Sequence, residues 1–547
     1  MPPRMTFSEA TKQSDKAMKR WNGWGEETIT SHLSTASSHF LQQVVGAGTP
    51  SPDVTFAEVV ARVPASRLPD HPLISTNPAE RLLHARGQSL PDWIALRGGC
   101  IDTFPDGVAF PQSAVEVRNL VHYAGEVGAY LIPYGGGTSV VGHINPLPGD
   151  RPVLTLDLKR ISNLHALDER NQLATFGTGV AGLPLEAQLR ARGYTLGHYP
   201  QSFEYSTLGG WIATRSSGQQ SLGYGRIEQL FAGGHLETPS GSLDIPPFPA
   251  SAAGLDLREV ILGSEGRLGI LTEATIRVRP LPQQEHYFVI FFPQWEQGLL
   301  AVRQLVQARL PLVMLRLSTP GETQTQLVLA GHTRVVNVLE RMLALRGAGK
   351  DKCMLMVGIA GREADVNRVH REVLDITHKQ KGISTGRTLG EQWHKKRFQT
   401  PYLRNTLWAL GYAVDTVETA TTWECVSTLT QAIETALRSA LQESGEQVHV
   451  FSHLSHLYPY GSAIYTTYLY RIAATPAETL RRWQALKDAA SQAIIAGHGT
   501  ISHQHGIGSD HQQYLISEKG ALGLSAMRQL YASFDPGGMM NPGKLVL

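Results

Sequence analysis

The chain has only three cysteines among its 547 residues, Cys100, Cys353 and Cys425. They are widely spaced, so they form neither a disulfide framework nor the paired ligands of a structural zinc site. Sparse cysteine of this kind is typical of a reducing compartment, and each thiol is expected to be a small core residue. We therefore expect a cytoplasmic protein without a metal site.

Long hydrophobic runs and a dominant charge are also lacking. No run of about eighteen apolar residues occurs, so no membrane-spanning helix is expected. Residues 1–19 are polar and lack the apolar region of a signal peptide. Lysine plus arginine (49) nearly balance aspartate plus glutamate (47) without forming a basic patch, which excludes a nucleic-acid footprint. Peripheral contact with a membrane and assembly into a homodimer both stay compatible with the sequence.

The length exceeds what one ordinary hydrophobic core needs, so two or three domains are expected. Residues 1–96 look helical and rich in proline-bearing loops. From 97 to 281, short apolar runs alternate with helical patterns, which predicts an α+β domain. Residues 282–499 repeat the alternation and predict a mixed sheet with covering helices. Residues 500–547 combine a glycine- and histidine-containing loop with a helix.

Three short segments of the α+β region give definite local expectations. Ser113 is placed to cap a helix over residues 114–121. Residues 128–132 form an apolar run that predicts a short buried strand. Residues 153–158 alternate apolar and polar side chains, which predicts a half-buried strand.

A glycine triplet follows the strand predicted at 128–132. Three consecutive glycines permit backbone conformations closed to other residues, so successive N–H groups can point into one concavity and bind an anion. The alternative is a plain glycine-rich turn, because a glycine triplet alone is a weak motif. The candidate cofactor-binding residues of this loop are Pro133, Tyr134, Gly135, Gly136, Gly137, Thr138 and Ser139.

Two further glycine-bearing segments follow in the same region. Hydroxyls and backbone N–H groups in such segments can hold phosphate oxygens or a ribose. The candidate residues of the second segment are Gln201, Ser202, Phe203, Glu204, Tyr205, Ser206, Thr207, Thr214, Arg215, Ser216 and Ser217. Those of the third are Glu265, Gly266, Arg267, Leu268, Gly269, Ile270 and Leu271.

The order of these three segments resembles the vanillyl-alcohol oxidase/p-cresol methylhydroxylase flavoproteins. The resemblance implies an α+β fold in which two subdomains hold FAD non-covalently, with the pyrophosphate on the glycine loop. It further implies an α/β cap domain over the isoalloxazine ring. Residues 97–281 would be the FAD-binding domain, 282–499 the cap, and 500–547 a segment that completes the active site, with 1–96 a helical N-terminal segment.

A narrower resemblance, to the alkyldihydroxyacetonephosphate synthases of ether-lipid synthesis, spans nearly the whole chain. It is carried by residues 19–25 (Lys-Arg-Trp-Asn-Gly-Trp-Gly), 195–202 and 502–508. It implies exchange of the acyl group of acyl-dihydroxyacetone phosphate for a long-chain alcohol, through a flavin adduct and without net redox change. An apolar channel is then expected to lead to the flavin.

The same resemblance assigns individual residues. Tyr465 matches the family's proton-donating tyrosine, although the pattern around it alone predicts an ordinary core residue of a strand. Arg404 falls where the family has an arginine that binds substrate phosphate, and Arg316 falls at another functionally important arginine, so both are candidate substrate-binding residues. The alternative for each is a surface ion pair of little energetic weight. The remaining candidates are His503 and His505, as proton carriers or loop anchors, and His198, as a residue near the flavin or a buried structural histidine.

Two departures widen the range of functions. Gln504 stands where the family has the middle histidine of three, and an amide cannot titrate. The runner-up function is therefore an FAD-linked oxidoreductase acting on a 2-hydroxy acid or a related alcohol. Such dehydrogenases hold a metal with a histidine pair in the cap, but the stretch holding His453 and His456 lacks their glycine–aspartate–glycine–asparagine run, so no metal is expected.

Overall fold

The computed structural model describes residues 19–330 and 333–546. The predicted absence of a signal peptide rests almost wholly on residues outside this range. No helix in the described part of the chain is long and apolar enough to cross a membrane.

The first sheet has four strands in the order β1-β2-β4-β3, and β3 and β2 each pair in parallel with β4. Ser113 caps α6 as predicted, because its hydroxyl accepts the N–H of Glu116. The strand predicted at 153–158 is buried along its whole length rather than half-buried, since parallel strands are covered on both faces. The elements are β1 (Ile74–Ser75), β2 (Gly107–Ala109), α6 (Ala114–Glu126), β3 (Tyr130–Tyr134), β4 (Val153–Asp157) and η1 (Leu158–Arg160).

The second sheet is antiparallel, in the order β5-β6-β10-β8-β9, and short helices cover it. Its strands are β5 (Leu164–Asp168), β6 (Leu173–Gly177), β8 (Phe231–Thr238), β9 (Gly241–Ile245) and β10 (Ile270–Arg277). The neighbouring elements are α7 (Gly182–Arg190), α8 (Leu208–Thr214), α9 (Ser221–Tyr224), α10 (Ile227–Leu230), α11 (Leu257–Ile261) and the small pair β7 (Tyr194–Thr195) and β11 (Arg279–Pro280).

The third sheet has seven antiparallel strands in the order β15-β12-β14-β13-β17-β18-β16. Along β12, Phe288 and Ile290 pack toward α12 and α15, whereas Tyr287 and Val289 face the opposite cluster. This alternation places hydrophobic side chains on both faces. The strands are β12 (Gln284–Phe292), β13 (Leu312–Ser318), β14 (Cys353–Gly361), β15 (Ile383–Ser384), β16 (Tyr412–Thr422), β17 (His449–Tyr458) and β18 (Gly461–Arg471).

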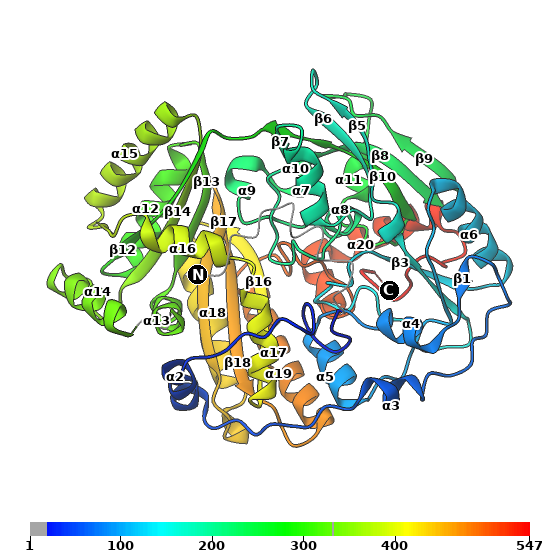
Figure 1. The fold of residues 1–547 in the computed structure, drawn as a ribbon, viewed down its shortest axis with the longest axis horizontal. Helices are drawn as coiled ribbons and strands as arrows, with labels where there is room; N and C mark the ends of the chain where they lie inside the picture. Colours follow the sequence, from blue (N-terminus) through cyan, green and yellow to red (C-terminus); the bar gives the residue numbers. More distant parts are fainter. Residues whose placement is uncertain (1–18, 331–332, 547) are drawn as a thin grey trace.

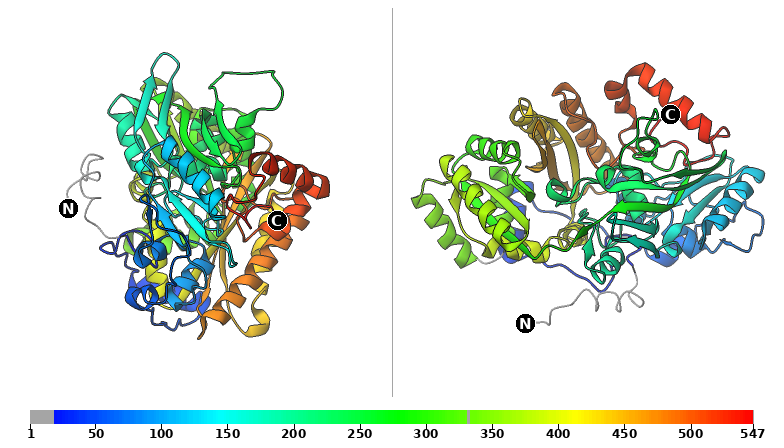
Figure 2. Two further views of the ribbon diagram at one scale, coloured as in Figure 1. Left: turned by 90° about the vertical axis from the view of Figure 1, so that its right-hand side faces the viewer. Right: turned by 90° about the horizontal axis from the view of Figure 1, so that it is seen from above.

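The helices of this region lie beside the seven-stranded sheet. Together they form the part of the molecule next to the two smaller sheets (Figures 1 and 2). They are α12 (Trp295–Gln307), α13 (Pro320–Leu329), α14 (Thr333–Leu345), α15 (Glu363–Lys379), α16 (Thr388–Lys396), η2 (Thr400–Tyr402), α17 (Leu403–Ala409), α18 (Val426–Ser439), η3 (Gln442–Ser444) and α19 (Pro476–Ala496).

The N-terminal and C-terminal segments pack against different sheets. Helix α2 (Thr35–Val45) contacts α13 and β18 of the seven-stranded sheet. The C-terminal segment instead returns to the first sheet, where Leu131 donates to Met539 and accepts from Asn541. The remaining terminal elements are α3 (Phe56–Val60), α4 (Pro78–Leu83), α5 (Leu90–Gly98), η4 (Gln512–Tyr514) and α20 (Leu515–Phe534).

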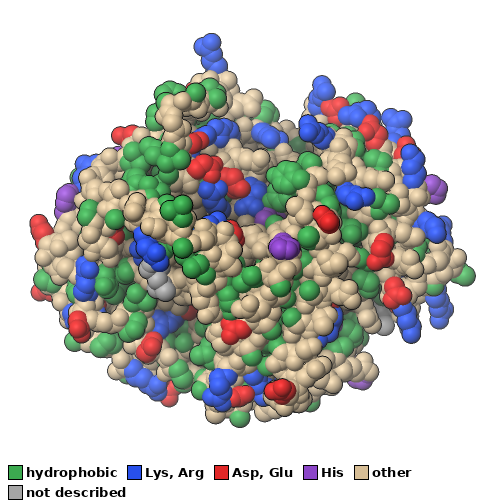
Figure 3. All heavy atoms as spheres, turned by 180° about the vertical axis from the view of Figure 1, so that it is seen from behind, with side chains coloured by type: hydrophobic (Ala, Val, Ile, Leu, Met, Phe, Trp, Pro, Cys, Tyr) green, Lys and Arg blue, Asp and Glu red, His purple; other side chains and the backbone are tan. Residues whose placement is uncertain are grey.

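The surface agrees with the small formal net charge of +2. On the face seen from behind, basic and acidic side chains are interspersed with hydrophobic ones (Figure 3).

Candidate active site

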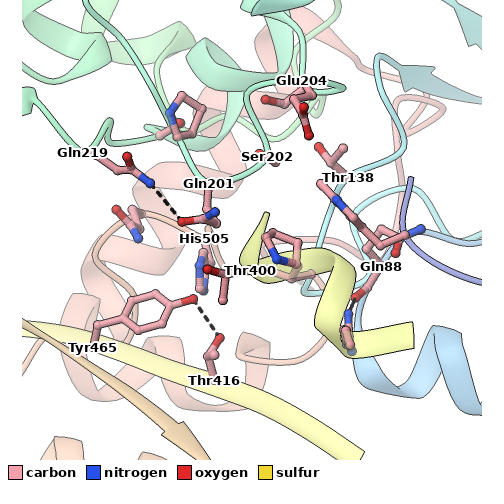
Figure 4. Close-up of a pocket in the computed structure, with 18 of the residues that line it drawn as sticks. Gln88, Thr138, Gln201, Ser202, Glu204, Gln219, Thr400, Thr416, Tyr465 and His505 are labelled. Atoms are coloured by element: carbon pink, nitrogen blue, oxygen red, sulfur yellow. Dashed lines mark hydrogen bonds between the residues drawn. The ribbon is translucent and has the colours of Figure 1, made fainter. Parts of the chain in front are cut away.

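A cavity of about 1370 Å³ lies between the three glycine segments and the seven-stranded sheet, and residues of all of these line it. Figure 4 shows Thr138, Ser202 and Glu204 on one side and Thr416 and Tyr465 on another, with Gln201 and His505 between them. Segments separated by more than three hundred residues therefore meet in one space.

The glycine loop leaves the end of β3, as predicted, and its residues 133–139 line this cavity. A Cβ atom on Gly136 would overlap the carbonyl oxygen of Tyr205, and one on Gly135 would overlap the hydroxyl of Thr207. The first and second glycine segments thus touch backbone to backbone. Glycine is required here for the close packing of the two loops.

The side chain of Lys19 binds the backbone of this glycine loop. Its Nζ donates to the carbonyl oxygen of Gly136 at 2.7 Å. In a trans peptide the next N–H points the opposite way, so the N–H of Gly137 is directed away from Lys19. No pattern in the sequence predicts this contact, although Lys19 opens the segment 19–25 that carries the narrower resemblance.

The structure divides the predicted cofactor-binding residues into two groups. The residues that line the cavity are Pro133, Tyr134, Gly135, Gly136, Gly137, Thr138, Ser139, Gln201, Ser202, Glu204, Ser206, Thr207, Thr214, Ser216, Ser217, Glu265, Gly266, Gly269 and Leu271. Those with other surroundings are Phe203, Leu268 and Ile270 in hydrophobic clusters, Tyr205 beside Tyr402, Arg215 on Glu259, and Arg267 on the backbone of Asn541.

Glu265, in the third glycine segment, ties the C-terminal loop to the cavity. Its carboxylate accepts the N–H of Ile507 at 2.6 Å and that of Gly508 at 2.9 Å, and lies 3.2 Å from the ring of His143. His143 in turn is 2.9 Å from the hydroxyl of Ser139. This chain of contacts joins the glycine loop to residues 506–508.

Tyr465 lies on β18 and points into the cavity (Figure 4). Its hydroxyl donates to Thr416 Oγ1 at 3.3 Å. The ring stacks on His453, with centroids 5.1 Å apart, and meets His505 edge to face at 5.7 Å. Burial raises the pKa of Tyr465 to about 12, so the phenol keeps its proton at neutral pH.

The two predicted substrate-binding arginines differ in what they already contact. Arg404 stacks over Trp93 and donates through Nη1 to the carbonyl of Gln88. Its Nε and Nη2 atoms are buried and have no hydrogen-bond partner among the described residues. Arg316 also lines the cavity, but its Nη2 pairs with Glu322 at 2.7 Å. Arg404 is therefore the better placed of the two to receive an anion.

His505 is the predicted histidine whose ring meets the cavity. Its Nδ1 lies 3.7 Å from Glu418, and its ring makes no hydrogen bond within the described residues. Burial lowers its pKa. Gln504 lines the cavity beside it, with its side-chain oxygen buried and unpartnered among the described residues.

His503 and His198 face other groups. Nε2 of His503 receives a guanidinium N–H of Arg226 and lies 2.7 Å from the hydroxyl of Tyr458. Arginine can only donate, so Nε2 acts as an acceptor and carries no proton. His198 contacts Ser216 at 3.1 Å, and burial lowers its pKa to about 3. Both rings are thus neutral near pH 7, which favours a structural role.

The described residues contain no group of three His, Cys, Asp or Glu side chains able to hold a metal ion. His453 contacts Glu322 at 3.1 Å, and His456 contacts Ser221 at 2.8 Å.

Two family models match the chain: the FAD binding domain over residues 105–244 and the C-terminal domain of FAD-linked oxidases over residues 281–545. The alkyldihydroxyacetonephosphate synthase of Dictyostelium discoideum is 31% identical over 90% of this chain and 82% of its own. The chain belongs to the alkyldihydroxyacetonephosphate synthase family. FAD is its cofactor.

Solved structures confirm the predicted fold of this synthase-family member. An alkyldihydroxyacetonephosphate synthase structure is 27% identical, with a TM-score of 0.82 over 96% of this chain and 98% of the other. A structure of p-cresol methylhydroxylase, 12% identical, has a TM-score of 0.66 over 94% of this chain and 98% of the other, which extends the likeness in fold to the wider flavoprotein group.

The residues present fit an FAD. Hydroxyl groups and glycine backbone from three segments converge on one cavity, as a pyrophosphate and ribose require. The individual roles of these residues, and the domain boundaries given above, stay predictions.

Sequence reasoning missed several cavity residues. Gln88, Thr400 and Thr416 all line the cavity, and Thr416 bonds the predicted proton donor. Each lies outside any glycine-rich or histidine-rich motif. Only strand register, which pairs Thr416 with Thr467 two residues from Tyr465, reveals the neighbourhood.

Proposed function

We propose that this protein is an FAD-dependent alkyldihydroxyacetonephosphate synthase, exchanging the acyl group of acyl-dihydroxyacetone phosphate for a long-chain alcohol. The observation that carries the proposal is Arg404, a residue of the same cavity as Tyr465 whose guanidinium has two buried donors without a partner among the described residues. A buried cation with free donors is stabilised by an anion, and a planar guanidinium fork matches a phosphate.

The bound flavin supplies covalent catalysis without net oxidation or reduction. The protein's own groups then have separate tasks. Arg404 binds and orients the phosphate, while the phenol of Tyr465, held by Thr416, supplies or receives a proton. His505, edge to face with Tyr465, is the neighbouring base in contact with the cavity.

A long alkyl chain also needs an apolar surface. The wall of the same cavity continues over α2, α13 and the far ends of β16 and β18. The apolar residues of this part are Leu33, Phe40, Leu41, Leu327, Leu407, Val414, Phe451 and Leu469. This lining supports the predicted channel for an acyl or alkyl tail.

Incubation with palmitoyl-dihydroxyacetone phosphate and hexadecanol tests the proposal. We expect mass analysis to find hexadecyl-dihydroxyacetone phosphate and one equivalent of released palmitate. Bleaching of the flavin by a 2-hydroxy acid, with no ether product from the first mixture, would instead establish the oxidoreductase alternative.

Replacement of Arg404 by methionine should raise the KM for the acyl substrate about 100-fold while FAD content is kept. Two charge-assisted hydrogen bonds of ~1.5–3 kcal/mol each are removed, and every ~1.4 kcal/mol is tenfold, so about 100-fold is the effect at the lower end of this range. Steady-state kinetics measure the change. Arg438→Met, on the exposed side of α18 in an ion pair with Glu434, is the matched control. An unchanged KM in Arg404→Met would refute the phosphate-binding role.

A further inference from the structure

Glu418 is a buried carboxylate in the middle of β16, with 3% of its side chain exposed. Its ion-pair neighbours among the described residues are the Nδ1 atoms of His503 and His505, each 3.7 Å away. A buried carboxylate is costly unless other groups stabilise its charge. The surroundings of Glu418 show which groups do so.

The backbone of residues 502–505 surrounds this carboxylate. Oε2 accepts the N–H of His503 at 2.9 Å, and Oε1 accepts the N–H of Gln504 at 3.0 Å and that of His505 at 2.9 Å. The hydroxyl of Ser502 adds a donor at 2.8 Å. Three successive N–H groups thus converge on one anion, an arrangement that fixes the conformation of a loop.

The position of β16 explains why this loop needs an anchor. β16 is the last strand of the seven-stranded sheet, so one of its edges has no strand partner in the part of the chain that the structure describes. The segment leading to residue 505 lies along that edge, where Thr500 donates its N–H to Ala420 at 3.1 Å. The carbonyl oxygen of Thr500 in turn accepts the hydroxyl of Thr419 at 2.6 Å. Glu418 continues this attachment by one more residue of the strand.

Strand register connects the anchor to the proton donor. Glu418 pairs directly with Tyr465 of β18. Directly opposed residues of antiparallel strands project from the same face, with Cβ atoms about 4.5–5.5 Å apart. The loop held by Glu418 therefore lies beside Tyr465, and the ring of His505 contacts the phenol edge to face.

We propose that Glu418 is a positioning residue that holds the backbone of residues 503–505 so that His505 meets Tyr465 inside the cavity. The inference about catalysis rests on the proposed function, whereas the inference about the loop does not. Glu418 acts through His505 and Tyr465 and needs no contact with substrate.

The test is Glu418→Gln, which keeps the size but puts an amide donor against backbone donors. We expect amide hydrogen exchange of a peptide covering residues 502–508 to accelerate at least tenfold. Turnover should fall about 10- to 100-fold, while KM for the acyl substrate and FAD content change less than twofold. If the glutamine variant fails to fold, Glu418→Asp, which keeps the charge but shortens the reach, should loosen the same amides.

The matched control is Glu446→Gln. Glu446 is a similarly buried carboxylate that binds the side chains of Arg471 and Arg482 away from the cavity. It should leave exchange at residues 502–508 and turnover unchanged. Unchanged exchange at these amides in folded Glu418 variants overturns the proposal. Faster exchange in a protein whose wild type forms no ether product supports the anchoring of the loop and removes only the proposed reaction.

Discussion

Tyr465→Phe should keep FAD bound and lower turnover by about 10²–10⁴-fold, the usual contribution of a positioned acid or base. The change removes one oxygen atom, which donates to Thr416, and leaves the ring contacts with His453 and His505 in place. Flavin absorbance gives the cofactor content, and single-turnover product formation gives the rate. Undiminished turnover would rule Tyr465 out as the proton donor.

The pKa of Tyr465 adds a second readout. Because burial raises it to about 12, the phenol stays protonated throughout the accessible range. Wild-type turnover should therefore show no alkaline loss due to this group below pH ~11, about one unit under its pKa. Tyr470→Phe is the control: Tyr470 lies buried on the same strand, and its hydroxyl bonds to the carbonyl of Thr479 rather than in the cavity. It should leave turnover unchanged.

The sequence predicted those parts of the site that are continuous in the chain. The glycine loop, the strand before it and the helix capped by Ser113 follow from local backbone preferences, which a short window contains. One error of detail was non-local, because the burial of β4 depends on its neighbours in the sheet. The difference in surroundings between Arg404 and Arg316 is non-local too, since it depends on whether Glu322 is nearby.

The histidine motif shows the same division. Residues 502–508 stand out in the sequence, yet nothing in them says which ring meets the cavity. That is decided by Arg226 and Tyr458, which bind His503, and by Glu418, which binds the backbone. These partners lie between 45 and 277 positions away, so only the folded chain reveals them.

Gly136→Ala should nearly abolish FAD binding, with a loss of at least ~90% of the flavin in purified protein and a matching loss of activity. The added Cβ atom would overlap the carbonyl oxygen of Tyr205, a backbone atom that cannot rotate away. The two glycine segments must then separate, and this also disturbs the carbonyl that Lys19 holds. Overpacking of this kind costs ~1–3 kcal/mol or more. Absorbance near 450 nm relative to 280 nm measures the flavin content.

Gly125→Ala separates this local effect from a general intolerance of the domain to substitution. Gly125 lies in α6, and a Cβ atom there would meet nothing within 4 Å. Alanine is also the better helix former by ~1 kcal/mol, so this variant should retain its flavin and unfold at the same or a higher temperature. If Gly136→Ala binds FAD as well as Gly125→Ala does, the two glycine segments can part without loss of the cofactor. Their backbone contact would then be a consequence of the fold rather than a requirement of FAD binding.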